Sequence, residues 1–203
     1  MYKEHQPTIS RHVAKSQGAF ADLFRFVIAT IRQPLHSTPL QVKDFKRLGS
    51  QSVFAFSYKA PALDWLADNE ATLYRDAMNI ADAAPDPDRL AREATFYFAT
   101  LPGLGLVKGG FMAQLAFGVS GCLDSHHAAR FGLRPSMLRA DSFKNAATKT
   151  QWRRLDAYLS AVNDCGGTEL LWDEWCAYVA ERAPQRYENA YAASALHCSA
   201  LGL

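Results

Sequence analysis

The residues with the clearest chemical potential in this chain lie in the segment Leu101–Leu133. Pro102 and the two glycines Gly103 and Gly105 interrupt a helical pattern, and a second helix is expected to begin near Leu106. Glycine adopts the positive φ angles of a tight reversal and leaves the backbone N–H groups uncovered by side chains. Those groups would lie at the N-terminus of the second helix, where partial positive charge favours an anion. The pattern therefore predicts a phosphate site, and a DNA phosphate is the occupant that we expect.

A carboxylate follows one helix later, at Asp124. Because it stands directly before Ser125 and His126, it is placed to cap the N-terminus of the next helix. A carboxylate held in this way is ionised and oriented, and it could stabilise the oxocarbenium-like sugar that forms when an N-glycosidic bond breaks. This chemistry needs a dry pocket and a nucleotide that is flipped out of the base stack. Two interpretations stay open for Asp124: a helix cap alone, or a cap that is also catalytic.

The order of these features resembles the helix-hairpin-helix DNA glycosylase superfamily, which includes endonuclease III, MutY and AlkA. The resemblance covers residues 89–133 and consists of L-P-G-apolar-G, an apolar helix, a short loop, and the sequence Asp124-Ser125-His126. It implies that the hairpin grips the backbone of double-stranded DNA through Gly103, Gly105 and the helix start. It also implies that Asp124 is the catalytic carboxylate and that His126 supports the local structure.

The lysine of bifunctional family members is displaced here. The resemblance places that nucleophile two residues after the second hairpin glycine, which is Val107, and Lys108 comes one residue later. One residue turns a helical side chain by about 100°, so this departure argues against lyase activity and leaves a monofunctional mechanism open. Val107 and Lys108 are then expected among the DNA-backbone contacts. A merely solvated Lys108 is the alternative interpretation.

Neither a metal nor a cofactor is predicted. The four cysteines (Cys122, Cys165, Cys176 and Cys198) are scattered and form no C-x-x-C pair, which supports neither zinc nor an iron–sulfur cluster. The adjacent His126 and His127 would point about 100° apart on a helix and chelate poorly together. Dispersed cysteines indicate a reducing compartment. No apolar run approaches the roughly 20 residues needed to cross a bilayer, so we expect no membrane partner and a cytoplasmic location.

Positive charge is concentrated in one part of the sequence. Residues 130–154 hold seven basic residues and one acid, whereas residues 164–188 hold six acids and two arginines. This segregation favours one DNA-facing side, with two ordinary solvated faces as the alternative. The residues expected to contact DNA on that side are Arg130, Arg134, Arg139, Lys149 and Arg153.

The coarse architecture is predicted to be mostly α, a compact helical bundle around the helix-hairpin-helix motif, in one or two lobes. We expect a single domain over residues 1–203, with the hairpin motif at about 89–133 and a C-terminal helical part at about 135–203. A long first helix is expected over 9–31, and residues 41–59 are left open between strand, loop and short helix. Trp172 and Trp175 are expected in the core, and Trp152 is expected to pack rather than to stack on bases.

Three functional hypotheses follow. The first is a monofunctional DNA glycosylase that excises an altered base with Asp124. The second is a non-catalytic module that only grips duplex DNA; its small, unextended chain is similar to helix-hairpin-helix proteins of bacteriophages, which implies a role in phage DNA metabolism or in the virion. The third is a structural helical protein of an assembly, with protein partners, in which the hairpin is only a tight turn. A phage origin would place the protein in the host cytoplasm or in the particle.

Overall fold

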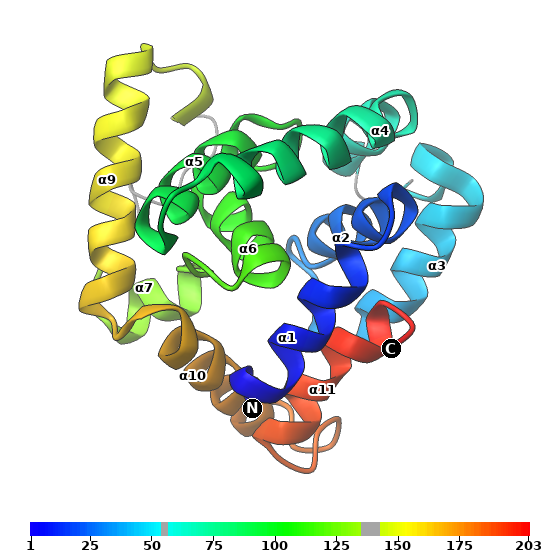
Figure 1. The fold of residues 1–203 in the computed structure, drawn as a ribbon. Coiled ribbons are helices and arrows are strands. Elements are labelled where there is room, and N and C mark those ends of the chain that lie inside the picture. The colour runs from blue at the N-terminus through cyan, green and yellow to red at the C-terminus, as the bar shows by residue number, and fades with distance from the viewer. Residues whose placement is uncertain (54–56, 135–142) are drawn as a thin grey trace.

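The computed structural model describes residues 1–53, 57–134 and 143–203. All regular elements in these ranges are helical, and none of them is a strand (Figure 1). The mostly α fold predicted from the sequence is therefore confirmed. No helix among the described residues is both long enough and apolar enough to cross a membrane.

The α-helices are named in chain order, and three short 3₁₀ segments connect some of them. The α-helices are α1 (Tyr2–Val13), α2 (Gln17–Ala29), α3 (Thr38–Leu48), α4 (Ala60–Ala83), α5 (Pro87–Thr100), α6 (Leu106–Phe117), α7 (Ser125–Arg130), α9 (Thr148–Asp164), α10 (Gly167–Arg182) and α11 (Ala190–Ala200). The 3₁₀ segments are η1 (Leu35–Ser37), η2 (Gly49–Ser52) and η3 (Ser57–Lys59).

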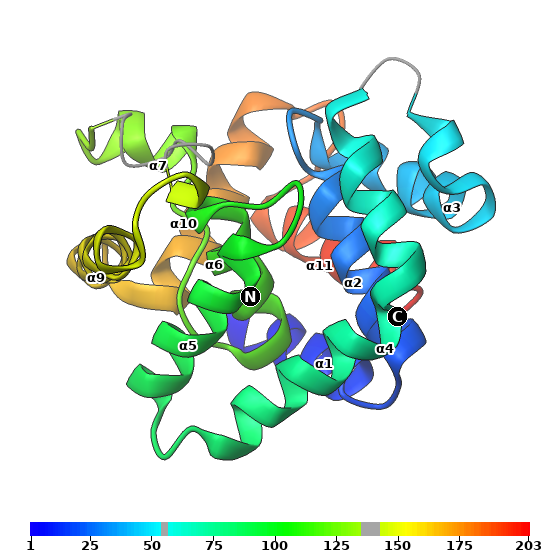
Figure 2. The same cartoon turned by 90° about the horizontal axis from the view of Figure 1, so that it is seen from above.

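Helix α6 occupies the middle of the molecule, as the two views show (Figure 1 and Figure 2). Most of its residues are buried, as expected for a helix that is apolar on all sides. Its residues belong to both hydrophobic clusters of the described structure. The larger cluster includes side chains of α1, α2, α4 and α11, and the smaller one is built around Tyr158 of α9. Helix α6 thus joins the two parts of the core.

The pairing of α5 with α6 forms the predicted hairpin. Asp86 begins α5 by accepting a hydrogen bond from the backbone N–H of Arg89 at 2.8 Å. The two helices then approach closely, because a Cβ atom added to Gly109 would lie 2.7 Å from the backbone nitrogen of Ala99. Glycine at this position therefore sets the distance between the hairpin helices.

In the N-terminal half one sequence expectation is corrected, and part of the segment left open is now assigned. The single helix expected over 9–31 is two helices, because Ser16 accepts a hydrogen bond from the N–H of Ala19 and caps a new helix. Helix α3 begins at Thr38 and continues to Leu48, so the first part of the undecided segment 41–59 is helical; Pro39 lies in its first turn, where proline is tolerated. Residues 54–56 of the undecided segment lie outside the described residues.

Candidate active site

The hairpin glycines differ in conformation and in exposure. Gly103 has φ 77° and is exposed, as the turn requires. Gly105 is extended, with φ −162° and ψ −169°, and it is buried, so the positive φ expected for it is wrong. Of the two hairpin glycines only Gly103 lies at the surface. Contact of either glycine with a DNA phosphate stays a prediction.

Val107 and Lys108 point to different parts of the molecule. Val107 packs against both hydrophobic clusters. The amine of Lys108 donates a hydrogen bond to Thr30 Oγ1 at 3.0 Å and lies 5.2 Å from the centre of the Phe111 ring. The side chain thus reaches inward across the start of α6, and the shift from position 107 to 108 does not remove the lysine from the interior site described next.

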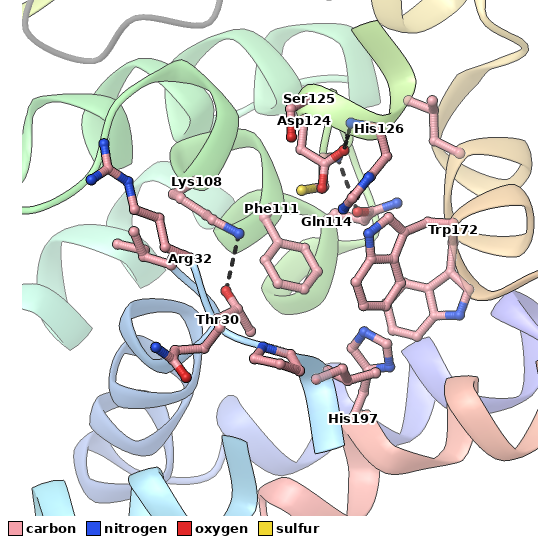
Figure 3. Close-up of a pocket in the computed structure, with 17 residues that line it drawn as sticks. Thr30, Arg32, Lys108, Phe111, Gln114, Asp124, Ser125, His126, Trp172 and His197 are labelled. Atoms are coloured by element: carbon pink, nitrogen blue, oxygen red, sulfur yellow. Dashed lines mark hydrogen bonds between the residues drawn. The ribbon is translucent and has the colours of Figure 1, made fainter. Parts of the chain in front are cut away.

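A cavity of about 500 Å³ opens beside the start of α6 (Figure 3). It brings together the segment after α2, the helix α6, the start of α7, and one face each of α10 and α11. Its charged and polar lining residues include Arg32, Lys108, Gln114, Asp124 and His126, and its ring residues include Phe111, Trp172, Trp175 and His197. Sites for small organic ligands typically measure roughly 300–1,000 Å³, so a nucleoside fits this size class.

Asp124 lines this cavity and caps α7, as the sequence predicted. Its Oδ1 accepts hydrogen bonds from the N–H of His126 at 2.9 Å, from the N–H of His127 at 3.4 Å, and from the His127 ring at 3.2 Å. Among the described residues, all hydrogen bonds to this carboxylate fall on Oδ1. Oδ2 is therefore the oxygen that remains available to a ligand.

The surroundings of Asp124 keep it ionised. Burial by itself raises the pKa of this carboxyl group, since only 18% of its side chain is exposed. The hydrogen bond from His127 and the neighbouring Lys108 and His126 outweigh burial, and the pKa lies below its ordinary value of 3.8. At neutral pH the cavity therefore contains a fixed negative charge on one wall and the Lys108 amine on another.

The two adjacent histidines have separate roles. His127 is buried, and its ring nitrogens lie 3.2 Å from Asp124 Oδ1 and 3.2 Å from the carbonyl oxygen of Leu171. His126 is exposed at the cavity, and its ring packs at a tilt against that of Tyr178, with ring centres 4.4 Å apart. The local support expected from His126 thus comes from the ring of His127.

The aromatic wall is both core and cavity surface. Trp172 is buried, donates a hydrogen bond to Ser194 Oγ at 2.7 Å, and lies 4.4 Å from the ring centre of His197. Burial lowers the pKa of His197 to about 4, so this ring is neutral. Trp175 is only partly buried and packs on the same histidine. The core assignment is confirmed for Trp172, whereas Trp175 packs against the core and is only partly buried; the position of both at a cavity was missed.

The segment from Thr30 to Leu35 forms the wall opposite Asp124, and the sequence analysis did not find it. Arg32 has φ 53°, an unusual backbone conformation for a residue with a side chain, and its guanidinium lies 5.4 Å from the ring centre of Tyr58. Such conformations gather at functional sites. Only the polar content of the sequence ATIRQ, at the end of an apolar helix, could have signalled this wall.

A buried lysine lies behind this wall. Lys59 is fully buried, and its amine donates hydrogen bonds to the carbonyl oxygen of Ala29 at 3.0 Å and to Gln41 Oε1 at 3.2 Å. Burial, together with the charge of Lys108, lowers its pKa to about 8. Gln41 in turn donates to Gln33 Oε1 at 3.3 Å. These bonds fix the segment that follows α2.

The basic residues predicted to contact DNA come from different elements: Arg130 ends α7, Arg134 follows it, and Lys149 and Arg153 lie one turn apart on α9. Arg130 forms an ion pair with Glu174 at 2.7 Å. Arg134, Lys149 and Arg153 are exposed, and Arg139 lies outside the described residues. Packing of Trp152 is confirmed, because its ring stacks on Phe96 at 3.9 Å and is covered by the guanidinium of Arg92 at 4.4 Å.

Among the described residues no group of three or more histidine, cysteine, aspartate or glutamate side chains is arranged to hold a metal ion. Comparison of the chain with family models, with curated proteins and with solved structures gave no match. The cavity and the residues that line it are therefore the features that bear on function.

Proposed function

We propose that this protein is a monofunctional DNA glycosylase, which removes an altered base by hydrolysis of its N-glycosidic bond. The observation that carries the proposal is the carboxylate of Asp124, held through Oδ1 and open through Oδ2 in a cavity of about 500 Å³. A fixed carboxylate beside a flipped-out nucleotide is what stabilisation of a sugar cation needs.

The lining of the cavity suits a nucleobase. Phe111, Trp172 and Trp175 supply ring faces, and base–aromatic stacking is worth about 1–3 kcal/mol per base. Neutral His197 donates from Nδ1 to the carbonyl oxygen of Ser194, at 3.0 Å, which leaves Nε2 as an acceptor. A base in the cavity could thus be stacked and hydrogen-bonded at the same time.

The reaction follows from this geometry. As the bond between C1′ and the base nitrogen breaks, its electron pair leaves with the base and positive charge develops on the sugar. Asp124 Oδ2 stabilises that charge and accepts a proton from the water whose oxygen bonds to C1′. The departing base takes up one proton, and Asp124 releases the proton that it accepted, which restores the carboxylate. The products are the free base and an abasic site, and the strand stays intact.

Duplex binding is assigned to the outer surface of the hairpin, around exposed Gly103, and to the exposed basic residues that follow it. Phosphate contacts of this kind position a protein without reading sequence. The cavity beside the start of α6 would then receive the extruded nucleotide.

The amine of Lys108 favours a second candidate reaction, because it lines the same cavity as Asp124. In that reaction the amine attacks C1′, the base leaves, and the resulting Schiff base permits strand cleavage. Reduction with borohydride during turnover traps such an adduct. An adduct formed by the wild-type protein and lost in Lys108→Gln would support this reaction, and no adduct would restrict the protein to hydrolysis.

The proposal is tested by assaying free bases. Duplex DNA that has been alkylated, deaminated or oxidised is incubated with the protein, and released bases are identified by mass spectrometry. We expect release of at least one altered base, with strand breaks that appear only after alkali. Duplex binding without release of any base would contradict the proposal and support the non-catalytic DNA-binding hypothesis.

A further inference from the structure

A second cavity, of about 430 Å³, adjoins the candidate active site. The two cavities share the wall formed by Gln33, Pro34 and Leu35, and both are lined by His126 and Trp175. The indole N–H of Trp175 is buried and has no hydrogen-bond partner among the described residues. Because buried donors are normally paired, this group is a candidate contact for a ligand that extends from one cavity to the other.

The outer wall of the second cavity is cationic. Its charge comes from Arg182 and Arg186, and no acidic residue of the described structure lines it. Both arginines are exposed, and neither forms an ion pair within the described ranges. Arginines that are not neutralised by carboxylates are suited to bind phosphate through two parallel hydrogen bonds.

Aromatic rings lie next to these cations. The guanidinium of Arg182 lies 5.1 Å from the ring centre of Tyr178, and the ring of His126, which lines both cavities, packs against the same tyrosine. A groove that alternates arginines with aromatic rings is typical of surfaces that hold an unpaired nucleic-acid strand. Because the two cavities share this wall, a strand in the groove lies directly beside the active-site cavity.

We infer that the second cavity binds the nucleotide adjacent, on the same strand, to the one whose base is removed, with Arg182 and Arg186 on the phosphate between them. This inference rests on the proposed function and extends it, since the substrate would be gripped at two consecutive nucleotides. The site is noncovalent and involves no chemical step.

The test asks whether the effect of neutralising one phosphate depends on the presence of the two arginines. Binding is measured with a duplex that carries a central tetrahydrofuran nucleotide, and with two versions in which the phosphate on its 5′ or its 3′ side is a neutral methylphosphonate. In the wild-type protein one of the two replacements should weaken binding about tenfold, as expected for loss of a charged hydrogen bond. In Arg182→Gln/Arg186→Gln, the unmodified duplex should bind about tenfold more weakly, and the same replacement should have no further effect.

Arg75→Gln is the matched control, because Arg75 is an exposed arginine on α4 that lines neither cavity. This variant should respond to the methylphosphonates as the wild type does. If the double variant and the wild type lose the same affinity on each replacement, the second site is refuted. If the phosphate effect depends on the arginines but no base is released, the second site is retained and the glycosylase activity is refuted. If base is released but the phosphate effect does not depend on the arginines, only the second site is refuted.

Discussion

Asp124 shows how one side chain can serve two purposes through two different oxygens. Oδ1 is committed to the start of α7 and to the ring of His127, while Oδ2 is free of protein partners among the described residues. The sequence predicted the cap because aspartate before a short polar helix is a local pattern. It could not predict the support from His127, since that ring is fixed by the carbonyl oxygen of Leu171 from a distant helix.

Replacement of Asp124 separates the cap from the catalytic charge. Asparagine is an equally good N-cap, whereas alanine costs about 1 kcal/mol at such a position. We expect the stability of Asp124→Asn to lie between those of the wild type and Asp124→Ala, because the cap is kept while the favourable negative charge is lost. The variant should release base at least about 100-fold more slowly, for loss of the same charge. Asp124→Ala should be less stable than the wild type and should also release base more slowly. Urea titration and single-turnover base release check this, and an active Asp124→Asn variant would remove Asp124 from the mechanism.

His197 predicts a pH dependence of stability. Its pKa of about 4 in the folded protein lies below the ordinary value of 6.5, because burial disfavours the charged ring. Between these values the unfolded chain binds a proton that the folded chain does not, so stability falls as the pH is lowered from 6.5 to 4. The His197 contribution is about 1.4 kcal/mol per pH unit.

Urea unfolding at a series of pH values measures this slope. In His197→Leu the slope of unfolding free energy against pH should be smaller by the His197 contribution. The remaining slope comes from other groups, among them His5, whose pKa is also lowered by burial. Equal slopes in the two proteins would show that His197 is not neutral in the folded state.

At the scale of elements, the hairpin was predictable and the long-range wall of the cavity was not. The breaks before α5 and α6 follow from a capping aspartate and from a Pro-Gly turn, which are local signals. The boundary between α1 and α2 was missed although Ser16 marks it, because the apolar spacing continues across the break. The segment after α2 has no pattern of its own, and it becomes a wall only where it meets α6 and α10.

The close approach of α5 and α6 gives a stability prediction. In Gly109→Ala the added methyl group would lie 2.7 Å from the Ala99 backbone, which must move. We expect a loss of about 2 kcal/mol in the free energy of unfolding, as for other overpacked sites. Gly18→Ala is the control, since nothing lies within 4 Å of its added Cβ, and the helix propensity of alanine should make it more stable by up to about 1 kcal/mol. Thermal unfolding of the wild type and the two variants measures these changes. If Gly109→Ala were as stable as Gly18→Ala, the close packing of α5 on α6 would not require glycine at this position.

At the scale of the whole molecule, cations that are far apart in the sequence lie together at the two cavities. The cations of the two cavities come from separate parts of the chain, namely Arg32, Lys108, Arg182 and Arg186. The last two belong to the stretch that looks acidic in the sequence. A count of charges along the chain could not group them, because only the packing of α2, α6 and α10 brings them to one side.

The exposed cations of α9 test the predicted duplex surface. Lys149→Gln and Arg153→Gln should each lower the slope of log affinity against log salt by about 1, without altering preference among sequences. Arg47→Gln is the control, because Arg47 pairs with Asp44 on α3, at the opposite side of the molecule from α9 (Figure 1). Fluorescence anisotropy at several salt concentrations gives the slopes. Slopes that do not change would place the duplex elsewhere.

The most direct test of the proposed site compares two abasic-site analogues in the same duplex. A pyrrolidine ring carries a positive charge where the reacting sugar would, and a tetrahydrofuran ring of similar shape is neutral. We predict that the wild-type protein binds the pyrrolidine duplex at least about tenfold more tightly, and that Asp124→Asn binds both alike. Equal affinity of the wild-type protein for the two duplexes would contradict a carboxylate that stabilises a sugar cation in this cavity.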